Sequence, residues 1–379
     1  MTGLPTLLDD LRRLVECESP SADLAAVARS ADVVAAVGTT RLGVPPERIV
    51  LEGCTHLRWR LGPDPSRVLL LGHHDTVWPL GTLAARPFVV EESASGGVVR
   101  GPGCFDMLAG LAMAFHAAAG LSGVTLLVTG DEELGSPSSR TLVEEEARSA
   151  AAALVLEASA DGGALKTERK GVSLYDLRVS GRAAHAGLDP EHGVNATVEL
   201  AHQVLALAGL GDAAAGTTVT PTVAGAGTTT NTVPAAGSVA VDVRVRTLAE
   251  QQRVDRAVRA LGPVLPGSQV EVLGGANRPP LERAASADLF ERARAVAARL
   301  GLPEPTAAAV GGASDGNLTA GVGTPTLDGL GAVGGGAHAD HEHVLVAPLL
   351  DRTALLRALV QSLLADSTKA AAMSGAGRP

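Results

Sequence analysis

The chain has 379 residues, and its composition excludes several classes of protein. Hydrophobic residues make up 46% and charged residues 19%, which is typical of a globular protein with a large core and not of a disordered one. The net charge is −10 and aromatic residues are only 2%, so neither attraction to phosphate backbones nor stacking on bases is expected. We therefore expect no nucleic-acid partner.

The cysteines, the apolar runs and the first residues indicate the cellular compartment of the protein. Cys17, Cys54 and Cys104 are odd in number and widely spaced, which favours reduced thiols over a disulfide framework or a thiolate metal site. No apolar run reaches the roughly 18 residues of a membrane span. The first residues are acidic where a secretion signal is basic. We expect a cytoplasmic protein that does not bind membranes.

Short apolar runs between turn residues predict buried strands in the first part of the chain. They cover 68–71, 124–128 and 152–156, and an Ala/Leu-rich helix is expected over 107–121 between the first two. Polar residues follow each run, namely 73–75, 131–133 and Glu157. Ligands of α/β sheets bind beyond the carboxyl ends of strands, so these residues are expected to share one site.

Residues 173–281 follow a different pattern, in which apolar and polar residues alternate. Alternation over 175–179 and 239–245 predicts half-exposed strands, and the segments between them complete the order β-α-β-β-α-β of a ferredoxin-like module. Helical segments return over 288–300 and 348–364. We expect an α/β domain formed by 1–172 and 282–379, into which an α+β domain, 173–281, is inserted.

Histidines and carboxylates at the strand ends have the composition of a zinc site. His73 and Asp75 are two residues apart and so share a direction, although a chance pair in a surface loop is the alternative. Asp106 precedes the expected helix, where an ordinary N-cap is the alternative. Glu157 ends a buried run, where an unpaired charge is costly.

Glu132 and Glu133 are adjacent, so their side chains face differently. One of them can bind a metal while the other takes a proton from water, and a solvated acidic turn is the alternative. His338, His341 and His343 follow a glycine-rich loop, and spacing does not say which one binds a metal. The remaining histidines, namely His56, His116, His192 and His202, are expected to be structural or exposed.

Several motifs, taken in order, resemble the dinuclear zinc aminoacylase/carboxypeptidase family, which includes glutamate carboxypeptidase, acetylornithine deacetylase and succinyl-diaminopimelate desuccinylase. The resemblance runs along most of the chain and is greatest to the glutamate carboxypeptidase branch. It implies a zinc-peptidase-like catalytic domain with a mixed sheet, and an inserted domain that acts as lid and dimer contact. The motifs include LLGHHDTV (70–77), RGPGCFDMLAG (100–110), TGDEELGSPSSR (129–140), LEAS (156–159), SGRAAHAGLDPEHGVNA (180–196), TTTNTVP (228–234), GGASDGN (311–317) and AHADHEHV (337–344).

The resemblance also implies roles for individual residues. One zinc ion would be held by His73, Asp106 and Glu157, and the other by Asp106, Glu133 and His338, with cobalt or manganese as possible substitutes. Asp75 would orient His73, and Glu132 would be the general base and acid.

Further roles fall on the inserted domain. His185 would stabilise the oxyanion, in the family from the partner subunit of a homodimer. Asn231, Arg244 and Arg278 would contact substrate, with Arg278 gripping its α-carboxylate. Outside the inserted domain, Asp315 is a further acid expected near the site.

The expected activity is hydrolysis of an amide bond in a small N-acyl or N-peptidyl amino acid, as in a glutamate-type carboxypeptidase. An N-acyl amino acid deacylase of the acetylornithine deacetylase type is the first alternative. A non-catalytic, metal-stabilised dimer is a remote one, because it requires the loss of Glu132 or a ligand.

Overall fold

The computed structural model describes residues 3–62, 67–92 and 96–375, and the chain divides into two compact units. The first comprises the chain up to Glu168, Arg283–Val310 and the residues from Ser314 onward. The second comprises Arg169–Glu282 and Gly311–Ala313. The two units therefore meet between residues 168 and 169 and between residues 282 and 283. The sequence predicted these boundaries at 172/173 and 281/282.

The first unit is built on a mixed sheet of six strands. They are β1 (Glu47–Leu51), β2 (Cys54–Leu61), β3 (Val68–His73), β6 (Val124–Thr129), β7 (Ala152–Val155) and β16 (Thr326–Leu327). The order is β1-β2-β6-β3-β7-β16, in which β6, β3, β7 and β16 are parallel and β2 and β1 are added antiparallel. The runs predicted as buried strands are β3, β6 and β7, and each is buried along its whole length.

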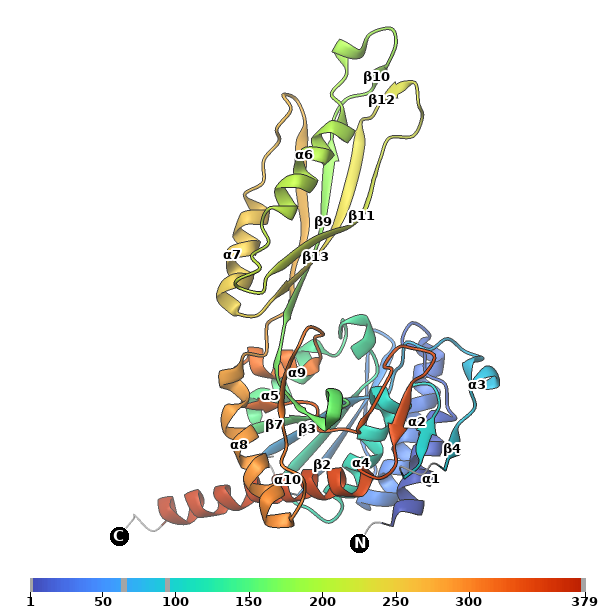
Figure 1. Cartoon of the computed structure of the whole chain (residues 1–379), viewed down its shortest axis with the longest axis vertical. Helices are drawn as coiled ribbons and strands as arrows, with labels where there is room; N and C mark the ends of the chain where they lie inside the picture. Colours follow the sequence, from blue (N-terminus) through green and yellow to red (C-terminus); the bar gives the residue numbers. More distant parts are fainter. Residues whose placement is uncertain (1–2, 63–66, 93–95, 376–379) are drawn as a thin grey trace. The chain divides into compact units, whose positions relative to one another are not determined.

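Helices cover both faces of this sheet (Figure 1). On one face α4 (Ala109–Ala118) contacts α1 (Leu4–Val15), α2 (Leu24–Leu42) and α10 (Leu349–Gly375). On the same face α8 (Arg283–Leu300) contacts α10. On the other face lie α5 (Arg140–Ser149) and α9 (Asp315–Gly321). Leu70 and Leu126 belong to the first core and Leu69 and Leu127 to the second, as the period of a strand requires. Among the described residues, no helix is long and apolar enough to cross a bilayer.

A smaller sheet brings distant segments of the first unit together. Its order is β17 (Gly334–Gly335), β18 (His343–Leu345), β5 (Val98–Arg100) and β4 (Val89–Glu91), with antiparallel pairing throughout. β8 (Leu165–Arg169) pairs separately with β15 (Ala307–Val310), and the short α3 (Thr82–Ala85) lies in the segment after β3. Because β18 pairs with β5, the loop between β17 and β18 lies near the loop that follows β5.

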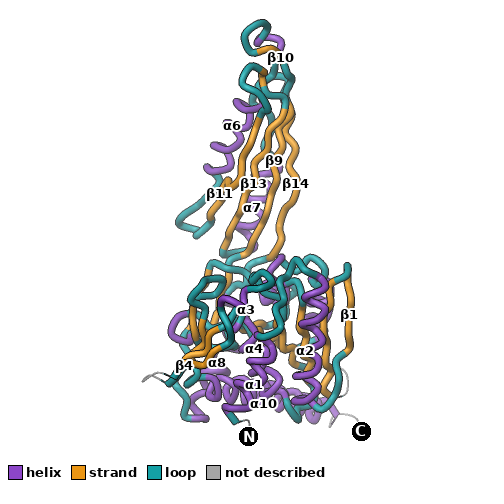
Figure 2. Tube along the Cα trace, turned by 90° about the vertical axis from the view of Figure 1, so that its right-hand side faces the viewer, coloured by secondary structure: helices purple, strands orange, loops and turns teal. Residues whose placement is uncertain are grey.

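The second unit has a four-stranded antiparallel sheet of order β11-β13-β9-β14 (Figure 2). Its elements are β9 (Gly171–Ser180), α6 (Ala196–Ala208), β11 (Thr218–Ala226), β13 (Ala236–Val245), α7 (Leu248–Arg259) and β14 (Gln269–Arg278). A two-stranded pair, β10 (Ala184–His185) and β12 (Thr232–Val233), is added. Both helices cover one face, against the alternating buried residues of β9 and β13. The observed order is the predicted β-α-β-β-α-β.

Candidate active site

The carboxyl ends of β3, β6 and β7 carry polar residues. His73 is the last residue of β3, Glu132 and Glu133 follow β6, and Glu157 follows β7. Because β3 lies between β6 and β7 and is parallel to both, these ends meet at one edge of the sheet. The structure therefore brings together the groups that the sequence places after buried strands.

Asp106 reaches the same edge from the loop before α4. Helix α4 begins at Ala109 rather than at the expected Met107, because the backbone of Asp106 (φ −113°, ψ 96°) and Met107 (φ −130°, ψ 30°) is non-helical. The Asp106–Met107 peptide bond is cis. The N-cap of α4 is Leu108, and no side chain caps it. The ordinary explanation of Asp106 as an N-cap is therefore wrong.

Gly110 sets the distance between α4 and the end of β7. A Cβ atom built on Gly110 would lie 2.1 Å from the carbonyl oxygen of Leu156, the residue before Glu157. Any larger side chain would push α4 away from this strand end. The glycine thus keeps the segment of Asp106 close to the segment of Glu157.

Asp106 lies between two histidines. Its Oδ1 is 3.5 Å from His73 Nε2, and its Oδ2 is 3.3 Å from His338 Nε2. His73 Nε2 is also 3.5 Å from Glu157 Oε1, and His338 Nε2 is 3.1 Å from Glu133 Oε1. Asp106 is therefore shared by two clusters, one with His73 and Glu157 and one with Glu133 and His338.

The carboxylates of the two clusters favour positive charge on the histidines. Asp106 and Glu133 raise the pKa of His338 to about 10. Burial opposes the protonation of His73, but the neighbouring carboxylates raise its pKa well above its ordinary value. Burial also disfavours ionisation of Asp106, yet His338 and His73 hold its pKa well below its usual range. A site with this balance attracts cations.

The ligand atoms fit metal ions of the zinc type. Within the described ranges, His73 Nε2 and Asp106 Oδ1 are buried and have no hydrogen-bond partner, which is costly. Imidazole nitrogen and carboxylate oxygen are donors that zinc takes in proteins, and a cation between these atoms would satisfy both. Ligand atoms of His73, Asp106 and Glu133 all lie within 4.8 Å of one another.

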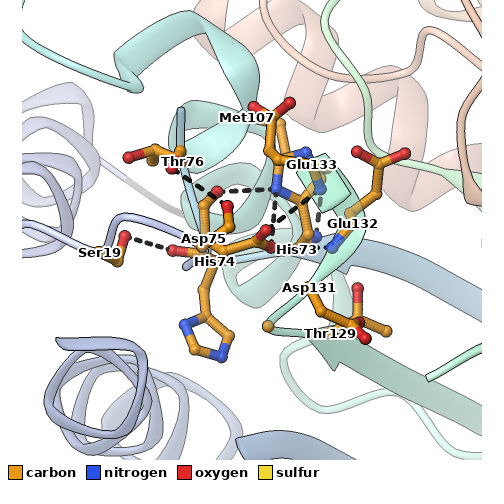
Figure 3. A network of polar contacts seen from close by, with 12 residues as sticks. Ser19, His73, His74, Asp75, Thr76, Met107, Thr129, Asp131, Glu132 and Glu133 are labelled. Atoms are coloured by element: carbon orange, nitrogen blue, oxygen red, sulfur yellow. Dashed lines mark hydrogen bonds and ion pairs between the residues drawn. The ribbon is translucent and has the colours of Figure 1, made fainter. Parts of the chain in front are cut away.

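Asp75 connects His73 to the turn after β6 (Figure 3). The backbone N–H groups of Glu132 and Glu133 donate to its carboxylate at 3.2 and 3.1 Å. His73 Nδ1 lies 2.9 Å from the Asp75 carbonyl oxygen and 3.5 Å from the carboxylate, so the nearer acceptor is the backbone. With Nδ1 donating, the neutral imidazole leaves Nε2 free of hydrogen toward Asp106.

Glu132 and Glu133 have different neighbours. Ligand atoms of His73, Glu132 and Glu157 lie within 4.8 Å of one another, whereas Glu133 faces His338. Glu132 is half-buried, which leaves it accessible to a small molecule at this edge. The two adjacent carboxylates therefore have different sets of neighbours, as expected of neighbouring side chains that face differently.

Of the three histidines in 338–343, the structure brings His338 to the acids. His343 Nδ1 instead lies 3.0 Å from the carbonyl oxygen of His341, and within the described ranges no ion pair joins His341 or His343 to the clusters. His338 has a φ of +60°, which is uncommon for a residue with a side chain and is often tolerated at functional sites.

Two buried acids, Asp315 and Glu342, accept hydrogen bonds from the segments that carry the site residues. Asp315 accepts hydrogen bonds from Ser136 Oγ and, at 3.2 Å, from Thr129 Oγ1, so it ties α9 to the end of β6 and the segment that follows it. Glu342 accepts from backbone N–H groups of the Asp106 loop. Sequence reasoning missed Glu342, because its partners lie 236 to 239 residues earlier in the chain.

The second unit places His185 and Asn231 together. β10 pairs with β12 next to Asn231, and the N–H of Ala186 donates to the Asn231 carbonyl oxygen at 2.9 Å. The N–H of Gly187 donates to His185 Nδ1 at 3.1 Å, so the neutral imidazole carries its hydrogen at Nε2. The His185 side chain is exposed and can present this donor.

Arg244 and Arg278 lie at the opposite end of the same sheet. Both pair with Val172 of β9, from the two neighbouring strands, whereas β10 follows Ser180 at the other end of β9. Arg244 makes a two-point ion pair with Asp242 at 2.8 and 2.9 Å, and Arg278 is buried. The four residues therefore form two separated pairs.

In a further group of potential ligands, Cys54, His56 and Asp131, the histidine and the aspartate are already engaged in hydrogen bonds. His56 Nδ1 accepts from Gly130 and its Nε2 contacts Ser138, while Asp131 accepts from two serines. Burial raises the pKa of the Cys54 thiol to about 12. His56 is structural, as is His116, which bonds Asp10 at 2.7 Å, whereas His192 and His202 are exposed.

A nitrogen and carboxylate site at the strand ends of an α/β domain suits a metal-dependent enzyme, and comparisons with known proteins give the class as metallohydrolases that act on amide bonds. The sequence profile described as Peptidase family M20/M25/M40 matches residues 69–362. The chain is 32% identical to carboxypeptidase G2 of Pseudomonas sp. (strain RS-16) in an alignment of 303 positions that covers 75% of this chain and 70% of that protein. The chain belongs to peptidase family M20/M25/M40, which confirms the resemblance drawn from its motifs.

Solved structures share the fold. Aminopeptidase PepT from Bacillus cereus ATCC 10987 superposes with a TM-score of 0.74 at 22% identity, over 96% of this chain and 99% of that one. The M20 family metallo-carboxypeptidase Sso-CP2 from Sulfolobus solfataricus superposes with a TM-score of 0.70 at 15% identity, with the same coverage. The catalytic domain with a mixed sheet and the second α+β unit are thus features that this chain shares with known peptidases.

Proposed function

We propose that the chain is a zinc-dependent hydrolase that cleaves the amide bond of an N-acyl or N-peptidyl amino acid, most like a glutamate-type carboxypeptidase. The observation that carries this proposal is the position of Asp106, which turns one carboxylate oxygen toward each of two histidine and glutamate clusters. The 32% identity to carboxypeptidase G2 supports the choice of a carboxypeptidase.

The ligand assignment follows the two clusters. His73, Asp106 and Glu157 would hold one zinc ion, and Asp106, Glu133 and His338 the other. Zinc in such a site polarises a carbonyl group and lowers the pKa of water, and cobalt or manganese can take its place.

Glu132 is the residue that moves the proton in this proposal. Its carboxylate takes a proton from the attacking water and returns it to the nitrogen of the leaving amine. Asp75 holds the backbone of Glu132, because its carboxylate accepts the Glu132 N–H, and its carbonyl oxygen is the nearer acceptor for His73 Nδ1. The proposed base and one proposed ligand are therefore both held by Asp75, one through its side chain and the other through its backbone.

The residues of the second unit bind and stabilise the substrate in this proposal. His185 Nε2–H would donate to the oxyanion, Arg278 would bind the α-carboxylate, and Asn231 and Arg244 would add substrate contacts. The eight-residue step from Val172 to Ser180 along β9 separates the two pairs by roughly 26 Å.

This separation supports a homodimer. Two pairs so far apart on one sheet cannot both contact one small substrate, so a second copy of the chain would supply His185. Leu205 on α6 and Val223 on the edge strand β11 are 73% and 71% exposed, so this unit offers apolar surface to a second copy. We propose that the second unit carries the dimer contact and acts as a lid.

The free thiols support a cytoplasmic location. Cys17, Cys54 and Cys104 are all free, and the last two are buried. Burial raises the pKa of Cys104 well above its ordinary value, so it has no reactive thiolate. These are the cysteines of a protein that folds without disulfides.

A deacylase of the acetylornithine deacetylase type would use the same metal site on a different substrate, and remains the second candidate. A non-catalytic, metal-stabilised dimer is disfavoured, because Glu132 and all five proposed ligands are present.

The test is a screen of N-acyl and N-peptidyl amino acids with the protein loaded with zinc, cobalt or manganese. We expect release of a C-terminal amino acid, with glutamate favoured. Cleavage restricted to N-acylated basic amino acids would overturn the carboxypeptidase assignment in favour of the deacylase. No cleavage of any amide by metal-loaded protein would overturn both.

A further inference from the structure

Glu342 is a buried carboxylate that gathers N–H donors. The backbone N–H groups of Gly103, Phe105 and Asp106 donate to it at 2.9, 2.8 and 3.0 Å, and the indole Nε1–H of Trp78 donates at 2.8 Å. Gly103 and Trp78 share Oε2, while Phe105 and Asp106 share Oε1. Both oxygens are thus used to hold the polypeptide rather than a ligand.

These contacts join three segments that are distant in sequence. Trp78 belongs to the segment after β3, Asp106 to the loop after β5, and Glu342 to the segment between β17 and β18. Within the last segment the N–H of Glu342 donates to the Ala339 carbonyl oxygen at 2.9 Å, which closes the turn that follows His338. A second tie, the ion pair of Arg86 with Asp340, joins the same segment to the region after α3.

We propose that Glu342 is a positioning residue that sets Asp106 and His338 at the distance needed to hold a common metal ion. The inference rests on the proposed function, which assigns Asp106, Glu133 and His338 to one of two ions. Glu342 binds the backbone of Asp106 directly and closes the turn that follows His338. It therefore links two ligands of that ion but only one ligand, Asp106, of the ion held with His73 and Glu157.

The chemistry of the contacts predicts which substitutions matter. Every partner of Glu342 is a donor, so the amide of Glu342→Gln would turn its own N–H groups toward at least one of them. Residues that orient metal ligands typically contribute about 10- to 100-fold to metal affinity. We expect Glu342→Gln to weaken one of the two zinc-binding steps by about that factor and to change the other step much less.

Glu199 provides a matched control in the second unit. It is also buried and accepts from two backbone N–H groups, those of Val264 and Leu265, and from Ser268 Oγ. Glu199→Gln removes the same kind of anchor from a segment that carries none of the proposed metal ligands. A loss of stability alone would therefore appear in both variants, whereas a loss of zinc affinity is expected only in Glu342→Gln.

The experiment measures zinc binding to the metal-free, full-length protein by competition with a chelating indicator, together with thermal unfolding of the metal-free forms. Two zinc ions bound by wild type and by Glu199→Gln, with one step weakened in Glu342→Gln, would support the proposal. Unchanged zinc affinity in Glu342→Gln would overturn it while leaving the proposed function intact. Fewer than two zinc ions bound by wild type would overturn the proposed function, and this inference with it.

A second variant covers the case in which Glu342→Gln does not fold. Trp78→Phe keeps an aromatic ring under Arg86, although a smaller one, and removes the indole donor to Oε2. We expect it to weaken the same zinc-binding step by a smaller factor. Zinc affinity equal to that of wild type in a folded Trp78→Phe protein, with no folded Glu342→Gln available, would overturn the proposal.

Discussion

At the scale of single residues, the two oxygens of Asp106 determine what the site can hold. One oxygen faces His73 and the other faces His338, and each histidine has a glutamate of its own. A carboxylate between two nitrogen donors suits a pair of ions, since it can bind both at once and so keep them close. Glu132 lies beside this arrangement with a half-buried carboxylate.

Glu132→Ala tests the proton-transfer role. We expect the zinc content to stay at the wild-type level and turnover to fall by about 10²- to 10⁴-fold, because the variant keeps every ligand and loses only the base. Zinc analysis and steady-state kinetics on one amide substrate measure the two quantities. Glu145→Ala, which removes an exposed carboxylate on α5, is the control and should retain full activity. Near-normal turnover in Glu132→Ala would show that another group is the base.

The sequence was sufficient for some of these residues and insufficient for others, for physical reasons. His73, Glu133 and Glu157 follow buried apolar runs, and neighbouring parallel strands must end together, so their proximity could be predicted. The choice of His338 among three histidines came from the family resemblance, because no local pattern separates them. Glu342 has neither kind of signal, since only the closed fold brings it to the Asp106 loop.

At the scale of elements, the start of α4 decides where Asp106 points. The Ala/Leu-rich composition of 107–121 predicted a helix but not its first residue, because helix propensity carries no information about the non-helical backbone at Asp106 and Met107. Strands β3, β6 and β7 were predictable because buried runs are continuous, and β9 and β13 because half-exposed strands alternate. Two-residue strands such as β10 have no periodicity to detect.

Gly110→Ala tests the close approach of α4 to β7. The added methyl group would lie 2.1 Å from a carbonyl oxygen, so the helix must shift. We expect a loss of about 1–3 kcal/mol in unfolding free energy, measured by chemical denaturation. Gly262→Ala, where nothing lies within 4 Å of the new atom, should be close to neutral. Equal stability of the two variants would contradict the packing described for α4.

Glu199 gives the second unit a defined response to acid. Its hydrogen bonds to backbone and side-chain donors, working against burial, lower its pKa from 4.5 to about 2. A carboxyl group with a depressed folded-state pKa stabilises the fold above its unfolded-state value and loses that contribution as the pH falls toward the folded-state value. The stabilisation should therefore disappear between about pH 4.5 and pH 2.

The measurement compares wild type with Glu199→Gln in denaturation series across this pH range. At neutral pH the variant should be less stable by about 1–3 kcal/mol, because donors are left without their acceptor. The difference should shrink as the pH approaches 2. A difference that stays constant with pH would mean that Glu199 does not titrate as described.

At the scale of the whole molecule, complementation between two inactive variants can test whether His185 of one copy acts at the metal site of the other copy. Glu132→Ala and His185→Ala are each expected to be nearly inactive. If His185 acts on the partner's metal site, a mixed dimer contains one complete site of its two, so the purified mixed dimer should have about half of wild-type activity. The two variants would be co-expressed with different tags, and the mixed dimer purified. Activity no higher than that of the separate variants would place His185 at the site of its own chain.

The central claim is that two metal ions at the shared Asp106 support amide hydrolysis, and a zinc titration of metal-free protein tests it most directly. Zinc content and hydrolysis of an N-acyl or N-peptidyl glutamate would be measured on the same samples. We predict no hydrolysis without metal and full activity only when two zinc ions are bound per chain. Full activity with one zinc ion per chain, or with none, would contradict the account.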